Sequence, residues 1–151
     1  MKLAEALQER ADLNRKIEQL RSRLRNNALC QEGEKTAEDP GELKEELDAS
    51  VARLAEITAK INLTNCRTVV DGITLTDMIA RKDALTLSLS VYKEIAQAAS
   101  QTVSRARNSE IRIMPAIPVR EWQKQIDRMA ESLRKLDNRL QESNWKTELI
   151  D

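Results

Sequence analysis

The chain has no histidine and no phenylalanine, and its aromatic side chains are limited to Tyr92, Trp122 and Trp145. Histidine is the side chain most often used in acid–base catalysis and a frequent metal ligand, so its absence excludes the commonest catalytic and metal-binding patterns. Surfaces that stack the bases of single-stranded nucleic acid need several exposed aromatic residues, which this chain lacks. Aliphatic side chains must therefore form the core.

Cysteine and glycine are also scarce. Cys30 and Cys66 are the only cysteines and do not form a C-x-x-C pair, so we expect two reduced thiols, with a single disulfide between them as the alternative. The three glycines stand singly in the sequence. This spacing excludes a glycine-rich phosphate-binding loop, which needs several glycines close together.

Net charge is absent, because 25 basic residues balance 25 acidic ones. The chain therefore has no overall field that would attract nucleic acid, and we expect no nucleic-acid partner. No uncharged apolar run approaches the roughly 18–20 residues of a membrane-spanning helix. The start, Met1–Leu7, is amphipathic and does not resemble a secretory signal, so we expect a cytoplasmic protein with no membrane span.

The dominant pattern in the chain is helical. Small or apolar side chains recur at alternating steps of three and four residues in four segments, at about 2–28, 40–64, 76–105 and 119–144. Asp39 followed by Pro40 is typical of a helix start, with Asp39 as the capping residue. We predict a single domain, residues 1–151, of mainly α class, with four long helices in a coiled-coil-like antiparallel bundle.

A short β element interrupts the helical pattern between the second and third helices. Residues 68–75 place β-branched side chains on both sides of Asp71-Gly72, a dipeptide that favours the positive φ angles of a two-residue hairpin turn. Thr76 follows and is predicted to cap the third helix. A further strand at about 110–114 would make the antiparallel sheet three-stranded rather than two-stranded.

The third helix is the most ambiguous segment. Leu85–Tyr92 alternates apolar and polar side chains, which also fits a strand, but helical periodicity extends well beyond this stretch. The apolar residues of the helix form two stripes, of which the second comprises Ala80, Ala84, Leu87, Val91, Ile95 and Ala98. A helix that is apolar on two faces has several neighbours, so we expect it at the centre of a bundle or in a subunit interface.

The C-terminal tail also ends in large apolar side chains, and such a tail either folds back on its own bundle or docks on a neighbouring subunit. The predicted interface accordingly comprises Leu87, Val91, Ile95, Trp145, Leu149 and Ile150. We therefore predict that the protein acts through protein association and forms a homo-oligomer. The sequence does not specify any other protein partner.

Few residues in the sequence suggest a catalytic or metal-binding role. Glu42 and Glu45 form the Glu-x-x-Glu step that binds Mg²⁺ in all-α nucleotide pyrophosphatases, but no second acidic pair lies between Glu56 and Asp71. A solvated first turn that complements the helix dipole is the simpler interpretation. Neither cysteine has a histidine base to activate it. We expect a non-enzymatic protein without a catalytic residue, metal or cofactor, and keep a carboxylate-dependent Mg hydrolase as an alternative.

Several longer strings carry a family resemblance, namely Met1–Leu7, Arg10–Leu13, Gln31–Glu34, Glu38–Pro40, Ile61–Asn65, Leu75–Asp77, Ala80–Leu85 and Asp137–Trp145. Across nearly its whole length the chain resembles small bacterial septicolysin-like proteins of unknown function. That family name implies a membrane-perturbing or pore-forming activity. Within the resemblance, polar residues concentrate around the hairpin and the adjoining helix ends, and they form either a pocket or a set of structural contacts: Asn62, Asn65, Asp77, Arg81 and Asp83.

Overall fold

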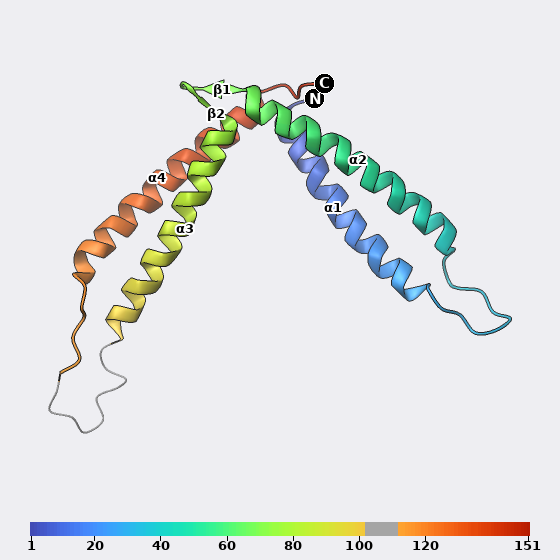
Figure 1. The fold of residues 1–151 in the computed structure, drawn as a ribbon, viewed down its shortest axis with the longest axis horizontal. Helices are drawn as coiled ribbons and strands as arrows, with labels where there is room; N and C mark the ends of the chain where they lie inside the picture. The colour runs from blue at the N-terminus through green and yellow to red at the C-terminus, as the bar shows by residue number, and fades with distance from the viewer. Residues whose placement is uncertain (102–111) are drawn as a thin grey trace. The chain divides into compact units, whose positions relative to one another are not determined.

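Four helices and one two-stranded sheet form the described part of the computed structural model, residues 1–101 and 112–151. In chain order the elements are α1 (Leu3–Asn26), α2 (Pro40–Arg67), β1 (Val69–Val70), β2 (Ile73–Thr74), α3 (Leu75–Ser100) and α4 (Val119–Lys146) (Figure 1). The predicted mainly α class with a small antiparallel sheet is confirmed. Contacts divide the chain into two compact units, the first being residues 1–70 and 143–151 and the second residues 71–142. The single-domain organisation stays a prediction.

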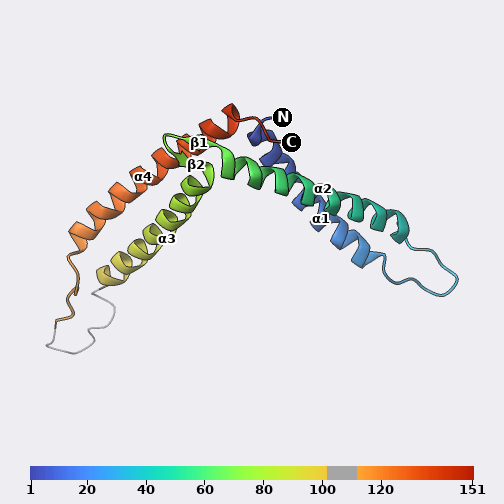
Figure 2. The ribbon, with the colours of Figure 1, turned by 45° about the horizontal axis from the view of Figure 1, so that its top comes forward.

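In the first unit, α1 and α2 lie side by side as an antiparallel hairpin (Figure 2). Their facing stripes are buried, and the core comprises Leu3, Ala6 and Leu20 of α1 with Leu43, Ile57 and Ile61 of α2. The guanidinium of Arg53 in α2 donates hydrogen bonds to both carboxylate oxygens of Glu9 in α1, with Nε–Oε1 at 2.6 Å and Nη2–Oε2 at 3.1 Å. The hairpin is therefore closed by an apolar seam and a bidentate ion pair beside it.

The start of α2 follows the sequence prediction. The carboxylate of Asp39 accepts a hydrogen bond from the backbone N–H of Gly41 at 2.8 Å, and Pro40 occupies the first turn. Proline suits this position because the backbone N–H groups of the first turn have no partner within the helix. Asp39 and Pro40 therefore define the boundary of α2 through local chemistry alone.

The β-hairpin is also where the sequence placed it. Asp71 and Gly72 both have positive φ angles, 51° and 83°, as a tight turn between β1 and β2 requires. The predicted cap of the third helix, Thr76, is wrong. Thr74 is the capping residue, because its hydroxyl accepts a hydrogen bond from the N–H of Asp77 at 3.1 Å while its own N–H donates to the Asp77 carboxylate. Three residues after Thr76 stands Ile79, whose side chain has no oxygen that could accept a hydrogen bond and complete a capping box.

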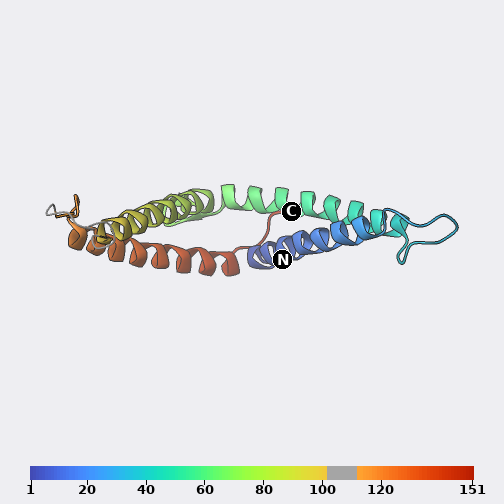
Figure 3. The same ribbon diagram turned by 90° about the horizontal axis from the view of Figure 1, so that it is seen from below.

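In the second unit, α3 and α4 lie side by side, as Figures 1 and 3 both show. Their core comprises Leu89, Ala96, Ile126 and Met129, flanked by Leu85, Tyr92, Ala130 and Leu133. The rings of Tyr92 and Trp122 lie in tilted contact, with their centroids 4.9 Å apart and their planes at 32°. Leu85–Tyr92 is helical, so the helix interpretation of this segment is confirmed and the strand alternative is wrong.

The segment before α4 differs from its prediction. Residues 110 and 111 of the expected third strand lie outside the described residues, and Arg112–Met114 form no strand. Pro115 and Pro118 follow directly and lack the backbone N–H that a strand ladder requires. The last predicted residues of the third helix, 102–105, also lie outside the described part, in which α3 ends at Ser100.

Candidate functional site

The most conspicuous surface of the second unit is a row of exposed apolar side chains on α3. Leu87, Val91 and Ile95 follow one another at steps of four residues and are 67%, 46% and 40% exposed. Exposed alanines continue the row at both ends, so that the α3 outer face comprises Ala80, Ala84, Leu87, Val91, Ile95 and Ala98. These are the residues of the second predicted stripe. Single exposed apolar residues are ordinary on protein surfaces, but a continuous row marks an interaction site.

The α3 outer face is exposed because α4 covers the other stripe of the same helix. Met78, Leu89 and Ala96 are buried, and at 3.6 residues per turn they lie on nearly the opposite side of α3 from Leu87 and Val91. The antiparallel pairing with α4 therefore uses only one of the two apolar stripes. The side chains of the second stripe remain exposed in the described part of this unit.

Charged groups lie only along the edges of the α3 outer face. Helical spacing places Asp83 and Glu94, both exposed, on one edge and Arg81, also exposed, on the other. Lys82 points to the α4 side, where its ammonium forms an ion pair with the carboxylate of Asp137 and lowers the pKa of that carboxyl group through a hydrogen bond. The centre of the α3 outer face is therefore free of charge, and one edge carries two like charges.

A shallow apolar groove of about 240 Å³ extends the surface at the C-terminal end of α3. It is lined by Ile95, Ala98 and Ala99 of α3 together with Gln101 and residues 113–117. Ile113 and Met114 are both exposed beside it. The apolar surface is therefore wider at this end of α3 than along the rest of the helix.

The C-terminal tail lies on its own first unit. The N–H of Leu149 donates to the carbonyl of Met1 at 2.8 Å, and the N–H of Ile150 donates to the hydroxyl of Thr64 at 3.0 Å. Leu149 and Ile150 are half-buried as a result, whereas Trp145 is 59% exposed. The two termini accordingly lie close together in Figure 1. A contact of this tail with a second subunit stays a prediction.

The predicted polar residues are divided between the two units. Asn62, which is exposed, and Asn65, which is half-buried, lie on α2, while Asp77, Arg81 and Asp83 lie on the first turns of α3. Asp77 completes the capping box of α3 and so has a local structural role. A pocket formed by all five residues stays a prediction.

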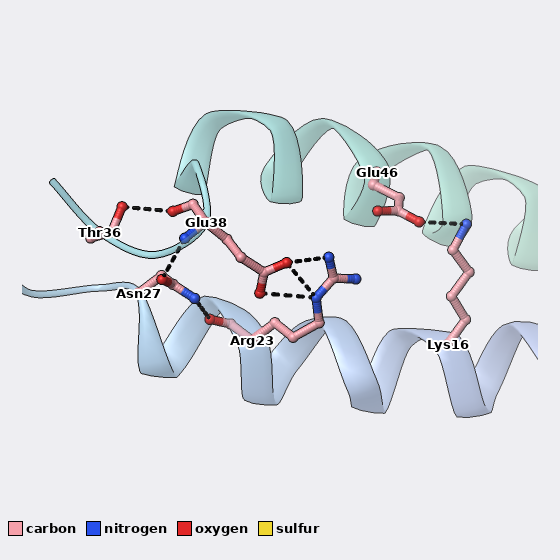
Figure 4. Close-up of polar contacts among 6 residues, drawn as sticks. All are labelled: Lys16, Arg23, Asn27, Thr36, Glu38 and Glu46. Carbon is pink, nitrogen blue, oxygen red and sulfur yellow. Dashed lines mark hydrogen bonds and ion pairs between the residues drawn. The ribbon is translucent and has the colours of Figure 1, made fainter.

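A polar cluster that the sequence did not reveal closes the loop between α1 and α2 (Figure 4). The buried side chain of Asn27 donates to the carbonyl of Arg23 at 2.8 Å and accepts from the N–H of Glu38 at 3.0 Å. The guanidinium of Arg23 hydrogen bonds to the carboxylate of Glu38 and lowers the pKa of that group. Thr36 donates to the carbonyl of Glu38 at 2.6 Å, and Lys16 pairs with Glu46 further along at 2.9 Å. The sequence contained one signal for this cluster, because an asparagine directly after a helix tends to hydrogen bond to nearby backbone groups.

The acidic side chains and the two cysteines are the remaining residues that could bind a metal ion or react. In residues 1–101 and 112–151, no group of three or more cysteine or acidic side chains is arranged to hold a metal ion. Cys30 and Cys66 are both exposed thiols. None of the helices in the same ranges combines the length and apolarity needed to cross a membrane.

These features define a class of protein built from two helical hairpins, with an exposed apolar face on the second. The chain belongs to DUF6847, a family of unknown function whose model matches residues 10–149. A similar solved structure, of a functionally unknown conserved protein from Corynebacterium diphtheriae, shares 35% identity with a TM-score of 0.94 over 99% of each chain. No curated protein matches the chain. Neither of the two matches carries the septicolysin-like name that the sequence resemblance implied.

Proposed function

We propose that this protein is a non-enzymatic protein that acts by self-association through the α3 outer face. The observation that carries the proposal is the continuous exposed row of Leu87, Val91 and Ile95 on a helix whose opposite stripe already forms a core with α4. Exposed apolar rows of this kind lower their free energy when a second apolar surface removes them from water.

A second copy of the chain is the occupant that we propose for this face, because the face is apolar along its length and uncharged at its centre. Large side chains occupy its middle, and alanines at Ala80, Ala84 and Ala98 allow two helices to approach closely at its ends. Identical patches are also always present at equal concentration, and symmetric dimers that use one patch twice are the commonest oligomers. The uncharged centre of the face lets two copies meet without burying an ionised group.

The size of the face sets the expected strength of the contact. From Ala80 to Ala98 the helix rises about 27 Å, and a single helix face of this length offers a few hundred Å² per copy. Stable interfaces bury about 800 Å² per partner, so the face alone supports a weak and reversible dimer. The groove beside Ile95 enlarges the contact at one end.

The test is the oligomeric state of the chain and of Leu87→Glu, measured by analytical ultracentrifugation from low to high micromolar concentration. We expect the mean mass of the wild-type chain to rise with concentration and that of Leu87→Glu to stay at one copy, because a carboxylate there would be buried against an apolar neighbour. Ser132→Glu places the same charge at an exposed position of α4 and serves as the control. A wild-type chain that stays monomeric throughout, or an equal effect of the two variants, contradicts the proposal.

A second candidate function is membrane perturbation, which the septicolysin-like resemblance implies and for which the same exposed row would supply an apolar contact. Leakage of dye from liposomes of several lipid compositions separates the two functions, since self-association in solution causes no release. We place the protein in the cytoplasm as part of the main proposal, in agreement with the sequence prediction. Fractionation of cells that express the tagged chain tests that location.

A further inference from the structure

A cleft in the second unit combines aromatic and charged side chains. It has a volume of about 520 Å³ and shares no lining residue with the α3 outer face. Pockets for small ligands commonly measure about 300–1,000 Å³, so the cleft has room for a molecule of one or two rings. It is lined by Tyr92 of α3, by Pro118, and by residues from the first three turns of α4, namely Glu121, Trp122, Lys124, Gln125 and Arg128.

Two of the three aromatic residues of the chain meet in this cleft. The rings of Tyr92 and Trp122 are both half-buried and contact each other, and Tyr92 also packs against the core that joins α3 to α4. These contacts hold the rings in place before any ligand arrives. A planar ring is the ligand group that such a surface favours, because aromatic contacts gain free energy beyond the burial of apolar area.

The charged side chains of the cleft are net positive and are left available by the protein. Helical spacing places Lys124 and Arg128 one turn apart on α4, with Glu121 beside them, and all three are exposed. Within residues 1–101 and 112–151, neither cation forms an ion pair, and the guanidinium of Arg128 makes only a long hydrogen bond, from Nε to the carbonyl of Lys124 at 3.4 Å. The planar fork of a guanidinium matches the oxygens of a carboxylate or a phosphate.

We infer that this cleft binds a small molecule that joins a planar ring to an anionic group, which is a carboxylate or a phosphate. The ring lies against Tyr92 and Trp122, and the anionic group is held by Arg128 and Lys124. The carboxylate of Glu121 opposes the negative charge and limits the affinity. Because the cleft is open to solvent, we expect a Kd of roughly 0.1–1 mM.

Nuclear magnetic resonance of the full chain tests the inference, because the two tryptophans give two separate indole N–H signals. Trp122 lines the cleft, whereas Trp145 belongs to the first unit and serves as an internal control, with Trp145→Phe to assign the signals. The probes are benzoate and adenosine monophosphate, compared with inorganic phosphate, which has no ring, and benzylamine, which carries a positive charge. We expect a saturable shift of the Trp122 signal with benzoate or adenosine monophosphate, and binding at least about tenfold weaker for the other two probes. The tighter of the two ring-bearing anions identifies the anionic group as carboxylate or phosphate.

Three variants locate the anionic group. Arg128→Gln weakens binding about tenfold, and Glu121→Gln tightens it about threefold because a repelling charge is removed. Arg134→Gln removes the same charge as Arg128→Gln from an exposed position of α4 outside the cleft and leaves binding unchanged. Circular dichroism verifies that all variants are folded.

Several results would overturn the inference. They are the absence of any shift of the Trp122 signal with both ring-bearing anions at about 10 mM, and equal binding of inorganic phosphate or benzylamine. Equal weakening by Arg134→Gln and Arg128→Gln, or a Glu121→Gln variant that binds no more tightly than the wild-type chain, would overturn it as well. These measurements do not depend on the oligomeric state, so the proposed self-association stands or fails separately.

Discussion

The hydrogen bonds by which Asn27 connects the end of α1 to the following loop yield the sharpest prediction about stability. Asn27 is 6% exposed, and its side chain accepts from the N–H of Glu38 and donates to the carbonyl of Arg23, which also accepts from the backbone N–H of Asn27. Asn27→Ala removes both hydrogen bonds at once. Each bond contributes about 0.5–1.5 kcal/mol net, and a buried backbone group left without a partner costs about 1–3 kcal/mol. We expect a loss of about 2–3 kcal/mol from the first unit.

Hydrogen exchange followed amide by amide is the appropriate assay, because the chain has two compact units and a single melting curve would mix them. The amide of Glu38 is the direct reporter, since its N–H donates to the side chain of Asn27 at 3.0 Å. In Asn27→Ala this amide exchanges rapidly, and the last turn of α1 opens more readily. Asn26→Ala, at an exposed neighbouring position, leaves the exchange of Glu38 unchanged.

The ion pair between Arg23 and Glu38 supplies a contrasting variant. Both side chains are partly exposed, at 45% and 39%, so Arg23→Ala destabilises the first unit much less than Asn27→Ala even though it removes a bidentate contact. The reasoning is refuted if Arg23→Ala destabilises the first unit as much as Asn27→Ala. It is also refuted if the amide of Glu38 remains protected when Asn27 is alanine.

Two further predictions concern a helix cap and the tail. Thr74→Ala removes the hydroxyl that accepts from the N–H of Asp77 and destabilises the start of α3 by about 1 kcal/mol, measured by hydrogen exchange of the amides in its first turns. Thr76→Ala has a much smaller effect, and equal losses would contradict the capping assignment. The hydrogen bond from Lys2 holds the pKa of Glu148 below its ordinary value near 4.5, so the unfolded chain binds the proton more readily. The stabilisation is therefore present above about pH 4.5 and is lost as pH falls through the lowered pKa. By hydrogen exchange of the first unit, Glu148→Gln is less stable than wild type at pH 7, and this difference shrinks as pH falls below about 4.5. A difference that does not shrink on acidification would show that the charge is not its source.

The sequence by itself determined the local structure of this protein wherever a few neighbouring residues decide the backbone. Asp39 and Pro40 specify the start of α2, and Asp71 and Gly72 specify the hairpin turn, because capping and positive φ angles are properties of the residues themselves. The cap of α3 was also readable, since Thr74 has an aspartate three residues later. The absence of histidine likewise limited the chemistry before any fold was known.

Only the tertiary structure decided which apolar stripe of α3 is buried and which is exposed. The stripe with Leu89 and the stripe with Leu87 and Val91 are both apolar, so the composition of α3 cannot choose between them. The choice depends on α4, whose own apolar face packs against one stripe and leaves the other to solvent. The same holds for the hydrogen bond from Ile150 to Thr64, 86 residues apart, because burial and distant pairing arise from contacts that no local pattern encodes.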